Sequence, residues 1–261
     1  MKRIALLCIF SLLAVLPAAA QDKPKADAAG NGAKAEAKPA AGAPTVDEIL
    51  ARYIKATGGK EAIEKATSRV AKGTFEIEAM NMSGVIEMYA KAPNKNAMII
   101  DLPGLGKIYG VYDGAKGYST DPMNGVRELE GLELAAMKRQ SDFYRDVNLR
   151  KHYPTITLKG REKVGAMEAY VLEATPAEGA PEKWYFDASN GLMIRQDGEE
   201  DSPQGKVTYE AYMEDFRDVD GIKTPFSIRR VTPAFSMSIK LTEVKQNITI
   251  DDAKFNKPSG Q

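Results

Sequence analysis

The sequence predicts an α+β fold that is mostly β: a strongly curved antiparallel sheet of about eleven strands, with helices capping its concave face. Three observations lead to this prediction. Apolar and polar residues alternate with a period of two in many short segments after residue 69. Turn dipeptides such as Asp113-Gly114 and Asn190-Gly191 separate neighbouring segments. Two stretches with helical spacing interrupt the strands, and they are the natural covers for the dry face of a large curved sheet.

Residues 1–20 have the pattern of a cleavable secretory signal peptide. Lys2 and Arg3 precede the apolar run 4–16, and small residues follow it up to Ala20. The run is shorter than the roughly 20 residues that span a bilayer. We therefore expect cleavage between Ala20 and Gln21, export from the cytoplasm and no transmembrane span after processing.

Cys8 suggests one alternative, a lipoprotein signal in which this cysteine is acylated. Most of the apolar run follows Cys8, which argues against that lipid-anchored form. Because Cys8 is the only cysteine, cleavage after Ala20 leaves a chain with no disulfide, thiol nucleophile or thiolate metal ligand.

Residues 21–44 are nearly all Ala, Lys, Gly, Pro, Asp and Glu, with no aromatic residue. Such a segment cannot bury enough apolar surface to offset the entropy of ordering it. We interpret it as a disordered tether in front of one domain, 45–261; contact of its lysines with a membrane or a cell-wall polymer is the alternative. The chain has 36 basic and 36 acidic residues, and this balance argues against a nucleic-acid surface.

The domain is predicted to begin with a helix. Thr45 and Glu48 have the spacing of a capping box, and apolar residues from Val46 to Ile54 follow a helical stripe. Gly58-Gly59 is a stop signal, because glycine is favoured just past a helix end. A shorter helical stretch is expected at 60–65.

Strands are predicted for most of the remaining chain. The first contains Phe75, Ile77 and Ala79, and three more follow at 85–90, 95–101 and 107–112. A second helical stretch is expected at 129–152, ended by Pro154. The other strands are expected at 155–163, 168–174, 182–187, 192–197, 206–216, 222–232 and 235–245.

The residues usually needed for catalysis are scarce. His152 is the only histidine, and we expect a solvated surface residue at the end of its charged helix. Without a cysteine, the usual Ser-His-Asp, Cys-His and His-rich zinc sites cannot be assembled. The acidic groups at 199–201 and 251–252 are expected to be solvated, and the strand patterns show no polar cluster on the inner face. The sequence therefore predicts a non-enzymatic protein without a metal or cofactor.

Methionines suggest an apolar site. The chain has 11 methionines, and all except the first lie in 45–261. Methionine is flexible and polarisable, so it fills irregular gaps in a core and also lines surfaces that accept varied apolar partners. Core filling and an apolar ligand pocket on the curved sheet are both open interpretations.

Several segments resemble a known family. Trp184-Tyr185-Phe186-Asp187, followed by Asn190-Gly191-Leu192-Met193-Ile194-Arg195, resembles a hairpin of outer-membrane lipoprotein-sorting-like proteins, the LolA-like superfamily. Segments 215–226 and 241–247, Phe255 and Pro258, and the opening 56–62 are similar as well. The resemblance covers 45–258. It implies an unclosed β-barrel capped by helices, with a hydrophobic cavity for lipid or lipoprotein acyl chains, and a periplasmic location. The chain departs from the dedicated carriers in its length, its tether and the lack of an evident counterpart to their cavity arginine.

The leading hypothesis is a periplasmic carrier or binding protein in envelope lipid or lipoprotein trafficking, with the helices as a movable lid. The predicted lipid-binding wall residues are Phe75, Ile77, Met88, Trp184, Phe186, Ile194, Met213, Met237 and Ile239. The alternative is a non-enzymatic sensing module on the same scaffold that binds an envelope protein partner and has its interior filled by side chains.

Overall fold

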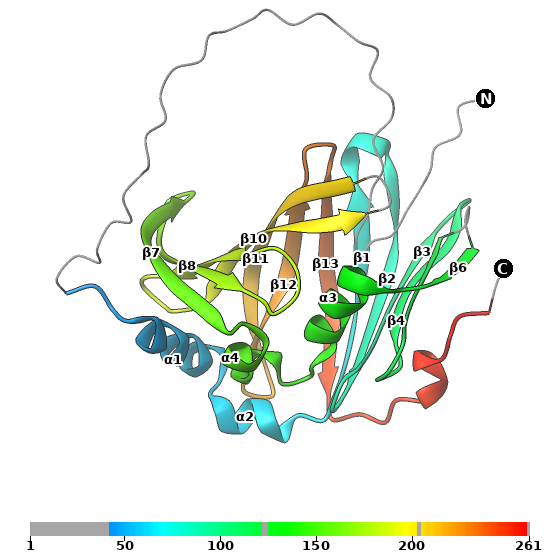
Figure 1. Cartoon of the computed structure of the whole chain (residues 1–261). Helices are drawn as coiled ribbons and strands as arrows, with labels where there is room; N and C mark the ends of the chain where they lie inside the picture. Colours follow the sequence, from blue (N-terminus) through cyan, green and yellow to red (C-terminus); the bar gives the residue numbers. More distant parts are fainter. Residues whose placement is uncertain (1–41, 122–124, 203–204, 260–261) are drawn as a thin grey trace, which may run out of the picture.

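The computed structural model describes residues 42–121, 125–202 and 205–259 (Figure 1). The predicted signal peptide lies outside these ranges, and so does the predicted tether except for 42–44; both stay predictions. In the described part of the chain, no helix is long and apolar enough to cross a membrane.

Helix α1 (Val46–Thr57) begins with the predicted capping box. The backbone N–H of Glu48 donates to Thr45 Oγ1 at 3.2 Å, and the backbone N–H of Thr45 donates to Glu48 Oε2 at 2.7 Å. The helix ends at Gly58, whose φ of 133° is unfavourable for any other residue. A Cβ atom at Gly58 would also lie 2.1 Å from the carbonyl oxygen of Gly221, so glycine permits the close approach of α1 to the sheet. Helix α2 (Lys60–Lys65) follows.

The described strands form one antiparallel sheet of 13 strands. Their bounds are β1 (Ser68–Ile77), β2 (Met82–Lys91), β3 (Lys95–Leu102), β4 (Gly106–Tyr112), β5 (Gly117–Asp121), β6 (Gly125–Glu128), β7 (Thr155–Val164), β8 (Met167–Thr175), β9 (Glu182–Asp187), β10 (Met193–Ser202), β11 (Gly205–Val219), β12 (Ile222–Val231) and β13 (Ser236–Gln246). The order is β6-β5-β4-β3-β2-β1-β13-β12-β11-β10-β9-β8-β7. Strands β1 to β6 pair in sequence order, strands β7 to β13 do the same, and the pairing of β1 with β13 joins the two series. Strands β6 and β7 are the two edges and do not pair, so the curved barrel is unclosed.

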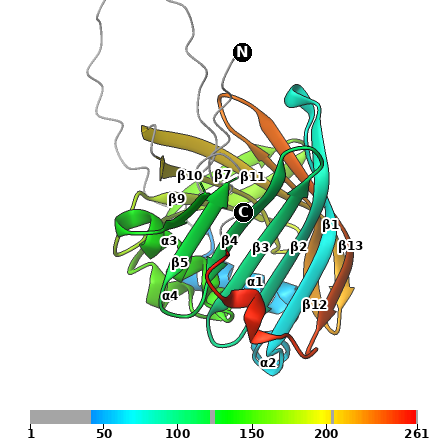
Figure 2. The same cartoon turned by 90° about the vertical axis from the view of Figure 1, so that its right-hand side faces the viewer.

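Apart from α2, which lies beyond one end of the strands, the helices lie on the concave side of the sheet (Figure 1). Helix α3 (Gly131–Ser141), the 3-10 turn η2 (Arg145–Val147) and helix α4 (Leu149–His152) connect the two edge strands β6 and β7. Figure 2, turned by 90° from Figure 1, shows the C-terminal 3-10 turn η3 (Asp252–Phe255) against the outside of β3 and β4.

Cross-strand partners share a face of a sheet, so the register assigns side chains to the two faces. On the concave face, Phe75 pairs with Ile239, Ile239 with Ile228 and Ile228 with Met213. This row crosses the middle of the sheet, from β1 to β11. The concave face is therefore apolar at its centre.

The convex face has a core of its own near β1 to β4. Val70, Tyr89 and Ala97 are successive cross-strand partners, and the C-terminal residues Ile250 and Phe255 pack over them. Phe255 is fully buried. The C-terminal segment thus covers part of the surface that a curved sheet would otherwise expose.

Two features differ from the sequence prediction. Strands β5 and β6 were not predicted, because they are short and rich in small and polar residues, without clear alternation. The expected continuous helix at 129–152 is broken at Asp142, which has an extended backbone. The Asp142 carboxylate accepts from the backbone N–H of Tyr144 at 2.9 Å and from the amide of Asn148 at 3.1 Å, so its side chain competes with the helix.

Candidate functional site

The centre of the concave face contains two adjoining cavities. The first, which we call the apolar cavity, has a volume of about 220 Å³. Its apolar walls are Ala71 on β1, Met88 on β2, Ile228 on β12 and Leu241 on β13. These residues meet because β1 lies between β2 and β13 in the sheet. Small and flexible side chains leave space here, whereas the neighbouring cluster around Phe75 is closely packed.

The second cavity, which we call the polar cavity, has a volume of about 190 Å³. Helix α1 contributes Tyr53 to its wall, η2 contributes Arg145 and Asp146, and β10 contributes Gln196. The two cavities share lining residues on β1 and β12: Arg69, Thr224 and Pro225. An elongated ligand would therefore meet an apolar end and a charged end.

Arg69 stands out by its electrostatics. Burial lowers its pKa, and the nearby carboxylate of Asp146 opposes that effect only in part. Its guanidinium carbon lies 5.8 Å from the ring centroid of Phe143. Its Nε atom is buried and has no hydrogen-bond partner among the described residues. A buried guanidinium nitrogen without a hydrogen-bond partner is costly, so its presence calls for an explanation.

A hydrogen-bond network surrounds Glu182, the first residue of β9, on the concave face of the sheet. Its carboxylate accepts from the Tyr153 hydroxyl at 2.9 Å, from the Trp184 indole at 3.0 Å and from the Gln196 amide at 3.0 Å. Arg139 on α3 lies 4.0 Å from it. Burial raises the pKa of Tyr153 to about 12, and the negative charge of Glu182 adds to the shift.

A second ion pair extends this polar region toward β12. Arg230 lies 2.6 Å from Glu200 and stacks on the ring of Tyr209, with 3.8 Å between the guanidinium carbon and the ring centroid. Burial raises the pKa of Glu200, although Arg230 opposes the shift. The Tyr209 hydroxyl also accepts from Gln196 at 3.1 Å, which joins the two groups.

Two sequence predictions are therefore wrong. A polar cluster does occur on the inner face, and Glu200 is not solvated, since only 15% of its side chain is exposed. The sequence pattern did not reveal either feature, because the acidic run 199–201 suggests a solvent-exposed turn. Pairing of β10 with β11 instead places Glu200 on the concave face of the sheet. Asp252, by contrast, is exposed and lies near Lys91 and Lys95, as expected for a surface acid.

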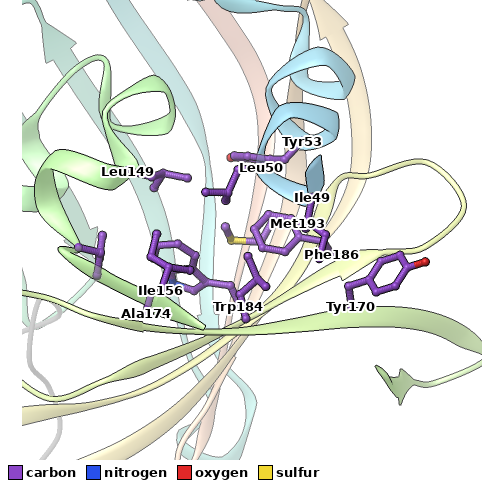
Figure 3. Packing of buried hydrophobic residues seen from close by; sticks show 12 residues of the cluster. Ile49, Leu50, Tyr53, Leu149, Ile156, Tyr170, Ala174, Trp184, Phe186 and Met193 are labelled. Carbon is purple, nitrogen blue, oxygen red and sulfur yellow. The ribbon is translucent and has the colours of Figure 1, made fainter. Parts of the chain in front are cut away.

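The β7 to β10 part of the concave face is filled by aromatic side chains (Figure 3). Trp184 contacts Tyr153 and Phe186 edge to face, with centroid distances of 4.6 and 6.5 Å. Tyr53 of α1 packs on Phe186 at 5.2 Å. Leu50 and Ile49 of the same helix complete the cluster, so α1 is fixed by its apolar stripe.

The predicted wall residues divide into three groups. Met88 lines the apolar cavity and Met213 the polar cavity. Five others belong to the packed concave clusters rather than to a cavity wall: Phe75, Ile77, Trp184, Phe186 and Met237, together with the half-buried Ile239 at their edge. A lipid-binding role for these residues stays a prediction.

Ile194 lies on the opposite, convex face. It packs with Tyr185 and Val171, whereas Trp184 and Phe186 alternate with Tyr185 and face inward. The cause is a β-bulge, which shifts the register between Met193 and residue 195 and interrupts the alternation of β10. The period-two pattern could not reveal this shift.

His152 also differs from expectation, because only 14% of its side chain is exposed. Its Nε2 lies 2.6 Å from the carboxylate of Asp142. The described ranges contain no cluster of three or more His, Cys, Asp or Glu side chains suited to a metal ion.

Comparison with solved structures agrees with the fold. No protein-family description and no curated protein matches the sequence. A DUF1329 family protein from Desulfovibrio piger matches in structure with a TM-score of 0.58 and 15% identity, over 82% of this chain and 98% of that one. A domain from Vibrio parahaemolyticus described as an outer membrane lipoprotein-sorting protein gives 0.58 and 13%, over 81% and 97%. A LolA superfamily protein from Nitrosomonas europaea gives 0.51 and 16%, over 82% and 99%. At these identities the likeness concerns the fold, which is LolA-like.

Proposed function

We propose that this chain, with its LolA-like fold, is a periplasmic carrier or binding protein that holds a lipid or a lipoprotein acyl chain on its concave face. The observation that supports the proposal most directly is the apolar cavity beside Ala71, Met88, Ile228 and Leu241. An unclosed sheet allows such a cavity to widen, because its edge strands are not joined. The signal peptide pattern of residues 1–20 supports the periplasmic location.

The cavity is small in this closed conformation. Typical small-molecule sites occupy about 300–1,000 Å³, whereas the apolar cavity has about 220 Å³. The adjoining polar cavity is covered by Tyr53 of α1 and by Arg145 and Asp146 of the α3–α4 segment. A long acyl chain that extends from the apolar into the polar cavity therefore requires α1 and this segment to move away from the sheet. We infer that these helices are the lid of the carrier.

Ligand extraction tests the proposal. The protein that begins at Gln21 is purified from the periplasmic fraction and weighed by native mass spectrometry, and uptake of a fluorescent fatty acid is measured. Bound lipid and saturable uptake are the expected results. Absence of both would reject the carrier function.

A pair of tryptophan variants identifies the cavity. Met88→Trp places a large ring in the apolar cavity and is expected to weaken uptake at least tenfold. Val85→Trp is the matched control, because Val85 lies on the same strand, faces the other side and is 57% exposed. Equal uptake by the two variants would place the ligand elsewhere.

The aromatic cluster favours a second candidate function. Trp184 and Phe186 already fill the β7 to β10 part of the interior. A sensing module that binds an envelope protein would need such a filled interior and no lipid. Lipid-free protein that captures no fatty acid would favour this second function over the first.

A further inference from the structure

Arg69 occupies the junction of the two cavities. It lines the apolar cavity together with Ala71 and Met88, and it lines the polar cavity together with Arg145 and Asp146. Residues of β1 alternate between the faces of the sheet, so Arg69 and Ala71 both point to the concave side, whereas Lys72 points outward. The guanidinium group is thus held at the end of the apolar cavity.

Arg69 is the incompletely compensated cation of the polar cavity. Arg69, Arg145 and Lys223 line this cavity, and Asp146 is the carboxylate among its described lining residues. The ammonium of Lys223 lies 3.8 Å from the carboxylate of Asp218. Arg145 is balanced by Asp146 and by the nearby Glu182. Arg69 receives only part of the compensation from Asp146, and its buried Nε has no partner in the described part of the chain.

We propose that the ligand is a single-chain amphiphile with an anionic head group, whose carboxylate or phosphate binds Arg69 in the polar cavity while its hydrocarbon chain lies in the apolar cavity. This inference rests on the proposed carrier function and specifies its ligand class. Arginine suits the task because its planar guanidinium group donates two parallel hydrogen bonds to a carboxylate or phosphate. A neutral lipid without an acceptor at this point would leave the buried Nε of Arg69 without a hydrogen-bond partner.

Lys223 gives the head group a route to the surface. It lines the polar cavity, and 43% of its side chain is exposed. The charged end of the site therefore reaches solvent near the turn between β11 and β12. The apolar end lies beside it, between β2 and β13.

Three ligands with the same chain separate the head-group chemistry. The two anions dodecanoate and dodecyl phosphate, kept below their micelle concentrations, and methyl dodecanoate, kept below its solubility limit, are titrated into the protein that begins at Gln21, with binding followed by calorimetry. At least one of the two anions is expected to bind tenfold or more tightly than the neutral ester. Preference for dodecanoate would indicate a free fatty acid, and preference for dodecyl phosphate a phospholipid-type head group.

Two variants test whether Arg69 is responsible for the preference for anionic ligands over the neutral ester. Arg69→Met is expected to bind the anions no better than the ester and to leave ester binding within about twofold. Lys72→Met is the matched control, because it removes a positive charge from the exposed face of the same strand and is expected to keep the full preference. Thermal unfolding confirms that each variant is folded.

The outcomes distinguish this inference from the proposed function. Equal binding of anions and ester by the natural protein, or an unchanged preference in Arg69→Met, would overturn the head-group assignment while leaving the carrier intact. Failure of all three ligands to bind would reject the carrier as well. If Arg69→Met does not fold, the comparison of ligands on the natural protein still decides.

Discussion

Glu182 shows at the scale of single residues how this interior combines polarity with burial. A carboxylate in such a place is normally unfavourable, because desolvation penalises its charge. Here the donors of Tyr153, Trp184 and Gln196 converge on it from three different strands or connections. These hydrogen bonds make Glu182 a junction between the aromatic cluster and the polar cavity.

We expect Glu182→Gln to destabilise the protein by about 2 kcal/mol, since a hydrogen bond to a charged group contributes about 1.5–3 kcal/mol. The amide replaces one acceptor oxygen by a donor that faces the donors of its neighbours. Urea unfolding at neutral pH measures the loss. Glu173→Gln is the control on the neighbouring strand, where the carboxylate pairs at the surface with Lys159 and a change below about 1 kcal/mol is expected. Equal losses of stability in the two variants would show that the hydrogen bonds to Glu182 stabilise the protein no more than a surface ion pair does.

Asp187 gives a prediction for acid stability. Burial alone would raise its pKa, but hydrogen bonds from Ser189 and Asn190 outweigh burial and lower the pKa below its ordinary value of 3.8. The ionised carboxylate is therefore favoured in the folded protein. Its stabilising effect is complete above pH 3.8 and is lost as the pH falls through the lower, folded value.

Asp187→Asn should accordingly be less stable than the natural protein at pH 7, and the gap should narrow as the pH falls to about 3. The measurement is the free energy of unfolding across this pH range. Asp101→Asn, at a half-exposed surface pair with Lys107, is the control and is expected to change the free energy of unfolding at pH 7 by less than about 1 kcal/mol. A gap for Asp187→Asn that stays constant with pH would contradict the prediction.

At the scale of elements, the features that depend on near neighbours in the sequence were predicted better than those that depend on pairing between strands. The capping box of Thr45 and the glycines after α1 act between near neighbours, so the sequence placed this helix correctly. The strands β7 to β9 and β11 to β13 were predicted to within three residues at each end, because their alternation is regular, whereas β10 continues five residues past the predicted end at 197. The position of Ile194 was wrong, because a bulge depends on pairing between β9 and β10.

The functional residues were harder to predict than the elements. Arg69 is one of 36 basic residues, and nothing in its local sequence separates it from surface arginines. Only the pairing of β1 with both β2 and β13 brings it to the junction of the cavities. Glu182 and Gln196 are similarly ordinary polar residues in strands, and their contact arises from the register of β9 with β10.

Helix α1 offers a direct test of the proposed lid. A Cβ atom at Gly191, in the turn between β9 and β10, would lie 3.4 Å from Cβ of Arg52 on α1. Disulfide-bonded cysteines have Cβ atoms about 3.5–4.5 Å apart. Arg52→Cys combined with Gly191→Cys should therefore form a disulfide that ties α1 to the sheet, and the chain from Gln21 onward has no other cysteine.

Oxidation of this double variant should slow fatty-acid uptake at least tenfold, and a reductant should restore it. The two single variants serve as controls, since the positive φ of 84° at Gly191 strains any substitution there. Uptake that is equally fast in the oxidised and reduced forms would show that α1 is not the lid and would direct attention to α3.

At the scale of the whole molecule, one continuous sheet joins two different cores. The cluster around Phe75 lies near β1 to β4, and the cluster around Trp184 lies near β7 to β10. The pairing of β1 with β13 and the uninterrupted order to β10 connect them through backbone hydrogen bonds. We therefore expect the sheet to unfold as one cooperative unit, although its two halves serve different parts of the proposed site.

Phe75→Ala tests this coupling. Removal of a fully buried phenylalanine typically costs about 3–5 kcal/mol. Trp184 is the only tryptophan and is buried in the other core, so its fluorescence reports unfolding there. If the sheet is one cooperative unit, the variant lowers the urea midpoint of Trp184 fluorescence and that of far-ultraviolet circular dichroism by the same amount.

Val85→Ala, at an exposed position of β2, should change neither midpoint appreciably. A fluorescence midpoint that stays in place while the dichroism midpoint falls would mean that the two cores unfold separately, and a carrier built in this way could open its apolar half while the aromatic half stays folded.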